Sequence, residues 1–259
     1  MQLNACKCRI NATLSRKKES HLTDKLLMRP IAPFVIMPTI SAIATTDANT
    51  HQSSVLESLQ AYVSETVKEF DQISAERRSI LNQVASEMRS NKAFSSQLTF
   101  ICTHNSRRSH LSQVWAQTAA TYYGLEEIQT FSGGTESTAC NIRTVRAMRR
   151  AGYLIVDSTG GKNPTYLIQY AENRPLIKVF SKVYNTTGNP TEDFIALMCC
   201  DQADEECPVV YGADRRFAIH YTDPKVSDGT AKETTVYDKR CRQIAREMFC
   251  LMSQVAKSK

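Results

Sequence analysis

The feature that most constrains the fold is a short apolar run that leads through a polar turn into an amphipathic segment. Residues 98–101 (Leu-Thr-Phe-Ile) are mostly apolar and rich in strand formers, as expected of a buried parallel strand. A polar turn follows at 103–108, and residues 109–123 carry apolar side chains on one helical face before Gly124. The pattern predicts a strand–loop–helix unit.

Strand-like and helix-like segments alternate along the rest of the chain. We expect strands at 128–131, 166–170, 177–180, 194–198 and 217–221, a glycine turn at Gly133-Gly134, and helices at 143–151, closed by Gly152, and at 231–255. This alternation predicts an α/β fold with a small, mainly parallel sheet flanked by helices on both faces.

The chain before this domain divides into two segments. Residues 1–50 lack a regular period, which favours a disordered or overcalled N-terminus. Residues 51–95 predict a helical extension with Ser74 as an internal N-cap, packed against the main domain at 96–259.

An apolar stretch at 31–44 raises two possibilities. Basic residues precede it and it ends in small residues, as an export signal would, but prolines interrupt it. A true start at Met28 or Met37 is the other interpretation. No run reaches the roughly 20 apolar residues of a membrane-spanning helix, so we expect no membrane contact.

The net charge and the cysteine content indicate which partners and which compartment to expect. The net charge of +6 is spread along the chain, so we expect no nucleic-acid partner. The nine cysteines form no evenly spaced framework, which favours reactive thiols in a reducing interior and predicts a cytoplasmic protein.

The loop after the first strand has the composition of an oxyanion site. Backbone N–H groups of such a loop, the N-terminus of the following helix and an arginine fork can together hold an oxyanion. The same positive field favours a cysteine thiolate, which makes Cys102 the candidate nucleophile and Arg108 the candidate oxyanion ligand. The other candidate oxyanion-binding residues are Thr103, His104, Asn105, Ser106, Arg107 and Ser109.

The spacing from cysteine to arginine is weak evidence by itself, because the chain repeats it. Cys140 is also followed six positions later by an arginine, Arg146. That match lies at the start of a predicted helix and lacks the serine, so we interpret Cys140 as structural. The strand–loop–helix context favours the first match over a merely buried cysteine at a strand end.

A second pair of thiols, Cys200 and Cys207, flanks six mostly polar and acidic residues after an apolar strand. This composition favours a mobile surface loop, and the spacing is too wide for a C-x-x-C zinc or redox motif. Thiol–disulfide exchange explains the pair better than a structural role. Cys199 is interpreted as core, and Tyr237, Asp238, Arg242 and Glu247 of the last helix as solvated face and packing.

These motifs resemble a known family. The loop at Cys102 is similar to the C-x-G-N-x-x-R-S signature of low-molecular-weight protein tyrosine phosphatases and of the thioredoxin-coupled arsenate reductases of the same fold. It departs from that signature at His104, where the family has glycine, and at Arg107, often a cysteine. The Cys200/Cys207 loop resembles the redox loop of the reductases, and Asp223-Pro224 resembles the family's general-acid loop.

The resemblance implies arsenate reduction. Cys102 would attack arsenate held by the loop and Arg108, Asp223 would protonate the leaving oxygen, and Cys200 then Cys207 would pass the oxidation on to thioredoxin. The implied substrate is arsenate or a phosphate-type oxyanion, and no metal or organic cofactor is implied. Two alternatives are a tyrosine phosphatase that forms a phosphocysteine, and an oxyanion-binding module without turnover.

Overall fold

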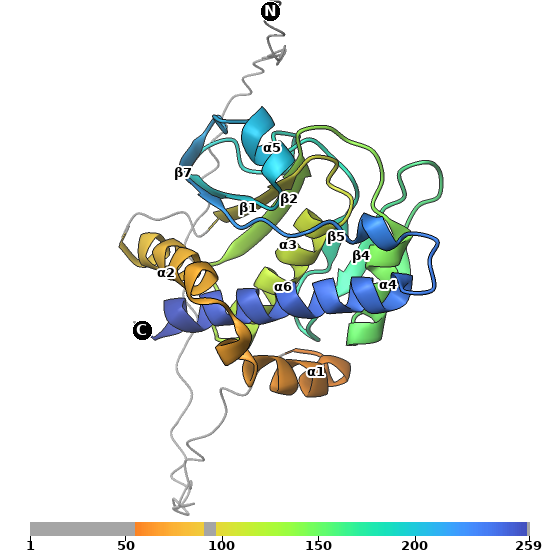
Figure 1. Cartoon of the computed structure of the whole chain (residues 1–259), viewed down its shortest axis with the longest axis horizontal. Helices are drawn as coiled ribbons and strands as arrows, with labels where there is room; N and C mark the ends of the chain where they lie inside the picture. The colour runs from red at the N-terminus through yellow and green to blue at the C-terminus, as the bar shows by residue number, and fades with distance from the viewer. Residues whose placement is uncertain (1–54, 91–96, 258–259) are drawn as a thin grey trace, which may run out of the picture. The chain divides into compact units, whose positions relative to one another are not determined.

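The computed structural model describes residues 55–90 and 97–257. Residues 1–50, expected to be disordered or overcalled, and the stretch at 31–44 lie outside the described residues. The described part contains both helices and strands, and the strands between residues 154 and 198 follow one another without an intervening helix (Figure 1). The α/β class predicted from the sequence is confirmed.

A parallel sheet of four strands forms the centre, in the order β2-β1-β6-β7. Its strands are β1 (Gln97–Cys102), β2 (Gln129–Gly134), β6 (Phe194–Met198) and β7 (Ala213–Ala218). Every neighbouring pair is parallel. The carboxyl ends of β1 and β6 therefore meet at one edge of the sheet, where open α/β sheets bind their ligands.

A separate antiparallel sheet lies beside the first. It consists of β3 (Leu154–Asp157), β4 (Tyr166–Gln169) and β5 (Ile177–Val179), in that order. The prediction that the strands at 166–170 and 177–180 belong to a mainly parallel sheet was therefore wrong. They are joined by a short connection, which suits antiparallel pairing, whereas a parallel crossover needs a dozen or more residues.

Helix α3 (Arg108–Tyr122) packs against β1 and β2 of the central sheet. Two further helices, α4 (Ile142–Ala151) and α6 (Glu233–Ala256), lie beside α3. Helix α6 packs along α3 and also contacts α4 (Figure 1). Trp115 of α3 is fully buried among aromatic rings, with Phe249 of α6 edge-on to it. Aromatic pairs of this kind add to the stabilisation from buried apolar area.

The segment before β1 folds as α1 (Glu57–Val67), a short 3₁₀ turn η1 (Phe70–Gln72) and α2 (Ala75–Ser90). The Ser74 hydroxyl accepts a hydrogen bond from Arg77 N (3.2 Å), so the predicted N-cap is confirmed. Both helices contact α6, and Arg242 of α6 bonds Glu69 at 2.8 Å. The division of the chain at 50 and 95 stays a prediction.

Two local predictions were wrong. Gly133-Gly134 is the end of β2 and not a turn. Residues 201–206, expected to be a mobile loop, form the short helix α5 (Asp201–Glu206). Glycine at 134 is explained by a close approach: a β-carbon there would lie 2.6 Å from Thr103 O and 2.8 Å from Asn105 N. The end of β2 thus packs directly against the loop after β1.

This close approach predicts a large cost for Gly134→Ala. The added methyl group would press on the backbone of two segments that cannot shift independently, which we expect to lower the free energy of unfolding by about 1–3 kcal/mol. Gly160→Ala is the matched control, since nothing lies within 4 Å of its added carbon. Urea unfolding followed by circular dichroism measures both. Equal stability of the two variants would contradict the proposed support of the loop.

Candidate active site

The loop of residues 103–107 joins β1 to α3 at the carboxyl edge of the sheet. Cys102, the last residue of β1, is 3% exposed, and its Sγ lies 3.1 Å from Ser109 Oγ. A hydroxyl at this distance can donate to a thiolate and stabilise it. The structure thus brings Cys102 and Ser109 together as the sequence predicted.

Asn105 fixes the shape of this loop. Its φ of 43° lies in the left-handed region, which asparagine tolerates better than most residues. Its buried side chain donates to Ser109 Oγ (2.9 Å) and accepts from Lys182 N (3.0 Å). These bonds hold the loop against both α3 and the segment after β5.

His104 occupies the position where the resemblance led us to expect a glycine. Positive φ among described non-glycine residues occurs at Asn105 and Asp193, so His104 has an ordinary backbone and its β-carbon is not strained there. Its imidazole points to the surface, 2.8 Å from Glu136. This position of the loop therefore does not require the conformational freedom of a glycine.

The backbone of the loop is open to an anion. Among the described residues, no protein acceptor is bonded to the N–H groups of residues 103–107. Helix α3 starts directly after them, at Arg108, so the partial positive charge of its N-terminus adds to these donors. Thr103 and Ser106 are buried within the same turn.

Arg108 is held at the edge of the loop by two acceptors. Its guanidinium donates to Tyr221 O (3.0 Å) and to the Asp223 carboxylate (2.9 Å), while Nε is buried without a partner in the described part of the chain. Asp223 also caps the short 3₁₀ helix η2 (Pro224–Ser227) by accepting from Lys225 N. The structure therefore brings Asp223 to the loop, as expected.

Arg107, a departure from the family signature, ties the loop to two other segments. It donates to Tyr237 Oη (2.7 Å) on α6 and lies 3.2 Å from Asp228. Tyr237 in turn donates to Asp228 (2.8 Å). The sequence interpretation of Tyr237 as simple packing missed this, because the partners lie far apart in sequence and no local pattern links them.

The second set of thiols lies beside the first. Cys199 N donates to Ile101 O (2.6 Å), which continues the β1–β6 pairing and sets Cys199 next to Cys102. Cys200, fully buried, has its Sγ 3.5 Å from Thr103 Oγ1. Cys200 and Cys207 cap the two ends of α5, and Cys207 is half-buried.

Helix α5 is fastened to β7 by Asp204. His220 Nε2 lies 3.0 Å from this carboxylate, and Arg216 bonds it as well. Neither residue was singled out in the sequence. An aspartate in a run of acidic residues carries no signal of a specific partner, so sequence reasoning could not have found the pairing.

Burial alters the pKa of several groups around the site. Full burial lowers the pKa of His110, one residue beyond Ser109, to about 3. Burial, together with the nearby Cys102, raises the pKa of Cys199, and burial raises the pKa of Cys140 to about 12. A neutral thiol is a poor nucleophile, so these values agree with structural roles for both cysteines.

No three His, Cys, Asp or Glu side chains in residues 55–90 and 97–257 are grouped closely enough to hold a metal ion. Over the same residues, none of the helices is both long and apolar enough to span a bilayer.

Comparison with known sequences gives a related family. No family model matches the chain. It is 27% identical over 143 residues to arsenate reductases of Bacillus licheniformis and of Bacillus subtilis strain 168, matches that cover 55% of this chain and 84% of each relative. An arsenate reductase of Halalkalibacterium halodurans is 25% identical over the same length. The chain is a distant homologue of the arsenate reductases.

Solved structures give weaker matches. A low-molecular-weight phosphotyrosine phosphatase from Vibrio cholerae O395 is 10% identical, with a TM-score of 0.42 over 61% of this chain and 94% of that one. The arsenate reductase of Archaeoglobus fulgidus is 15% identical, with a TM-score of 0.39 over 60% and 98%. Scores of this size do not establish a relationship on their own.

The buried His110 predicts a pH dependence of stability. Its pKa is about 3 in the folded protein against 6.5 for a free imidazole, so below pH 6.5 only the unfolded state takes up the proton. Stability should then fall as pH drops from 7.5 to 5, by about 2 kcal/mol from this group. His110→Gln should remove that part of the slope in urea titrations, and His104→Gln, at a partly exposed histidine, should keep it. Identical slopes in both variants would contradict the assignment.

Proposed function

We propose that the protein is an arsenate reductase that uses Cys102, Cys200 and Cys207 in succession. The observation that carries the proposal is the position of Cys200, whose Sγ contacts the loop of Cys102 through Thr103 at 3.5 Å. Hydrolysis of a phosphate ester needs no second thiol at this place. Homology to arsenate reductases supports the same choice.

In the first step, the Cys102 thiolate attacks the arsenic atom of arsenate. The open N–H groups of residues 103–107 and Arg108 hold the oxygens, and arsenate replaces the Asp223 carboxylate as the partner of Arg108. Asp223, in its protonated form, gives its proton to the leaving oxygen, which departs as water. The product is a covalent Cys102–arsenic(V) adduct.

The second step transfers two electrons to arsenic. The Cys200 thiolate attacks Cys102 Sγ, the sulfur–arsenic bond breaks, and arsenic leaves with the bonding pair as arsenite. A Cys102–Cys200 disulfide remains. The Cys207 thiolate then attacks Cys200 Sγ, which frees the Cys102 thiolate and leaves a Cys200–Cys207 disulfide. A dithiol reductant of the thioredoxin type restores both thiols.

The last transfer requires α5 to unwind. Seven residues along a helix correspond to about 10 Å, whereas the Cα atoms of a disulfide lie roughly 4.4–6.8 Å apart. Helix α5 has six residues and its N-cap and C-cap are the two cysteines themselves. A helix this short is marginal on its own, so unwinding costs little once the bond to Asp204 is released. Unwinding also exposes Cys200, which is buried in the resting protein.

A phosphatase is the second candidate. The arrangement of Cys102, Arg108 and Asp223 would suffice for it, since a phosphocysteine formed at Cys102 is released by water and Asp223 supplies the proton. The two candidates share the first step and differ in what attacks the adduct. Cys200 and Cys207 take part only in the reductase.

Cys200→Ser separates the candidates. We expect arsenite formation from arsenate, with thioredoxin, thioredoxin reductase and NADPH, to fall by at least about 100-fold, because the arsenic adduct loses its attacking thiol. Hydrolysis of an aryl phosphate by Cys102 should remain within a few-fold of wild type. Cys140→Ser is the matched control, because Cys140 is also a buried cysteine and has no part in the proposed relay.

Two outcomes would decide against the reductase. One is unchanged arsenite formation in Cys200→Ser. The other is a wild-type protein that forms no arsenite but hydrolyses the aryl phosphate, which would establish the phosphatase.

A further inference from the structure

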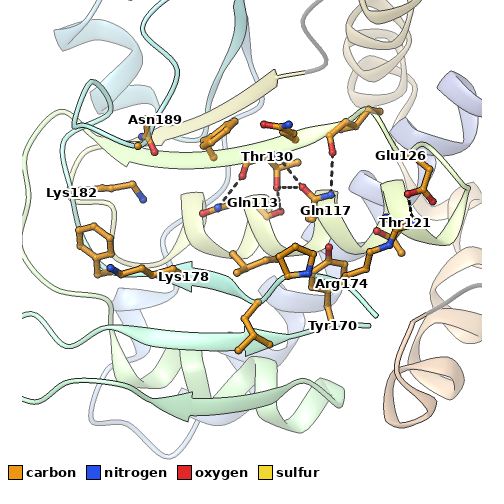
Figure 2. A pocket seen from close by; sticks show the side chains of 18 of the residues that line it. Gln113, Gln117, Thr121, Glu126, Thr130, Tyr170, Arg174, Lys178, Lys182 and Asn189 are labelled. Carbon is orange, nitrogen blue, oxygen red and sulfur yellow. Dashed lines mark hydrogen bonds and ion pairs between the residues drawn. The ribbon is translucent and has the colours of Figure 1, made fainter. Parts of the chain in front are cut away.

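A cavity of about 580 Å³ lies between β2 and β5. One wall comes from α3 and β2, and the other from β5 and the segments that flank it (Figure 2). Its volume falls in the range of sites for small molecules, roughly 300–1,000 Å³. None of the residues 102–109 lines it, so it is separate from the candidate active site.

Two lysines concentrate positive charge at one end of the cavity. Lys182 Nζ lies 5.0 Å and Lys178 Nζ 5.4 Å from the centre of the same ring, that of Phe180. Figure 2 shows the Lys182 side chain extending into the space, with Lys178 at the same end of the cavity. Within the described residues, neither ammonium group forms an ion pair with a carboxylate. The acidic residue of the cavity, Glu126, is bound by Arg174 at the opposite end.

Burying the charged side chain of Lys182 without a bound anion costs free energy. The residue is only 8% exposed, and an ammonium group withdrawn from water without an anion is unfavourable. Burial, and secondarily the positive charge of Lys178, lower its pKa to about 8. Its backbone is held by the bond from Lys182 N to Asn105 Oδ1, so the side chain starts from a fixed point at the cavity wall. An anionic ligand would offset the cost.

The opposite wall is rigid and polar. Gln113 Nε2 donates to Thr130 O and Thr130 Oγ1 donates to Gln113 O, both at 3.0 Å, and Gln117 bonds Thr130 as well. These bonds fix the side chains of α3 against β2. The lining also includes apolar and aromatic side chains, among them Phe131, Pro175, Ile177 and Phe180. A ligand would thus meet positive charge at one end and both polar and flat apolar surface along its body.

We propose that this cavity binds a small organic monophosphate that carries a flat ring, of about the size of a nucleoside monophosphate. A phosphate monoester carries a charge of about −1.5 to −2 at neutral pH, which matches two ammonium groups, whereas a carboxylate would match one. The site is independent of the proposed reductase chemistry.

Calorimetric titration of the full-length protein with adenosine 5′-monophosphate tests the proposal. Wild type should bind the nucleotide saturably, and adenosine, which lacks the phosphate, should show at least tenfold weaker binding. Lys178→Gln should weaken binding of the nucleotide about tenfold, the value of one charge-assisted contact. Lys178 is exposed, so this variant keeps the fold. The exposed Lys162→Gln is the matched control and should stay within twofold.

Arg108→Gln separates this cavity from the oxyanion loop, since that loop could also take a phosphate. The proposal requires that nucleotide affinity survive in Arg108→Gln within twofold. Loss of binding in Arg108→Gln with full binding in Lys178→Gln would overturn it, as would the absence of saturable binding to wild type at millimolar nucleotide.

Discussion

The parallel pairing of β1 with β6 is the constraint on which the rest of the site depends. It sets the ends of two strands, distant in sequence, side by side at one edge of the sheet, with Ile101 opposite Met198. Cys102 and Cys199 follow directly, and Cys200 comes within reach of Thr103. A one-residue slip would turn every side chain of β6 to the other face of the sheet. The register therefore decides which cysteine faces the loop.

A polar network fixes the loop itself. Asn105 bonds Ser109 on one side and the backbone of Lys182 on the other, while Arg107 is bound to Tyr237 and Asp228. Burial and the bond to Asp228 raise the pKa of Tyr237 to about 12, so its hydroxyl stays protonated and keeps donating. The loop is thus held before any anion arrives, and preorganised donors of this kind cost no rearrangement during reaction.

Local sequence patterns predicted most of the elements around Cys102. They failed where a residue's structure depends on partners that lie far away in the sequence. The strand, loop and helix around Cys102 follow from neighbouring residues, as do Ser74 as a cap and Gly152 as the end of α4. Gly133-Gly134 was predicted to form a turn because glycine usually marks one. The pair instead forms the end of β2, where Gly134 packs against the loop after β1. Helix α5 is too short to show a helical period. The roles of Tyr237 and Asp204 come from partners that no local window contains.

In the proposed relay, one arsenate consumes two thiols of this chain and leaves a defined disulfide. A single-turnover reaction of the reduced protein with arsenate, without any reductant, tests this most directly by counting free thiols and mapping disulfides by mass spectrometry. We expect one arsenite per chain, the loss of two thiols, and a Cys200–Cys207 disulfide, replaced by Cys102–Cys200 in Cys207→Ser. Arsenite formed with no Cys200 disulfide, or no thiol lost at all, would contradict it.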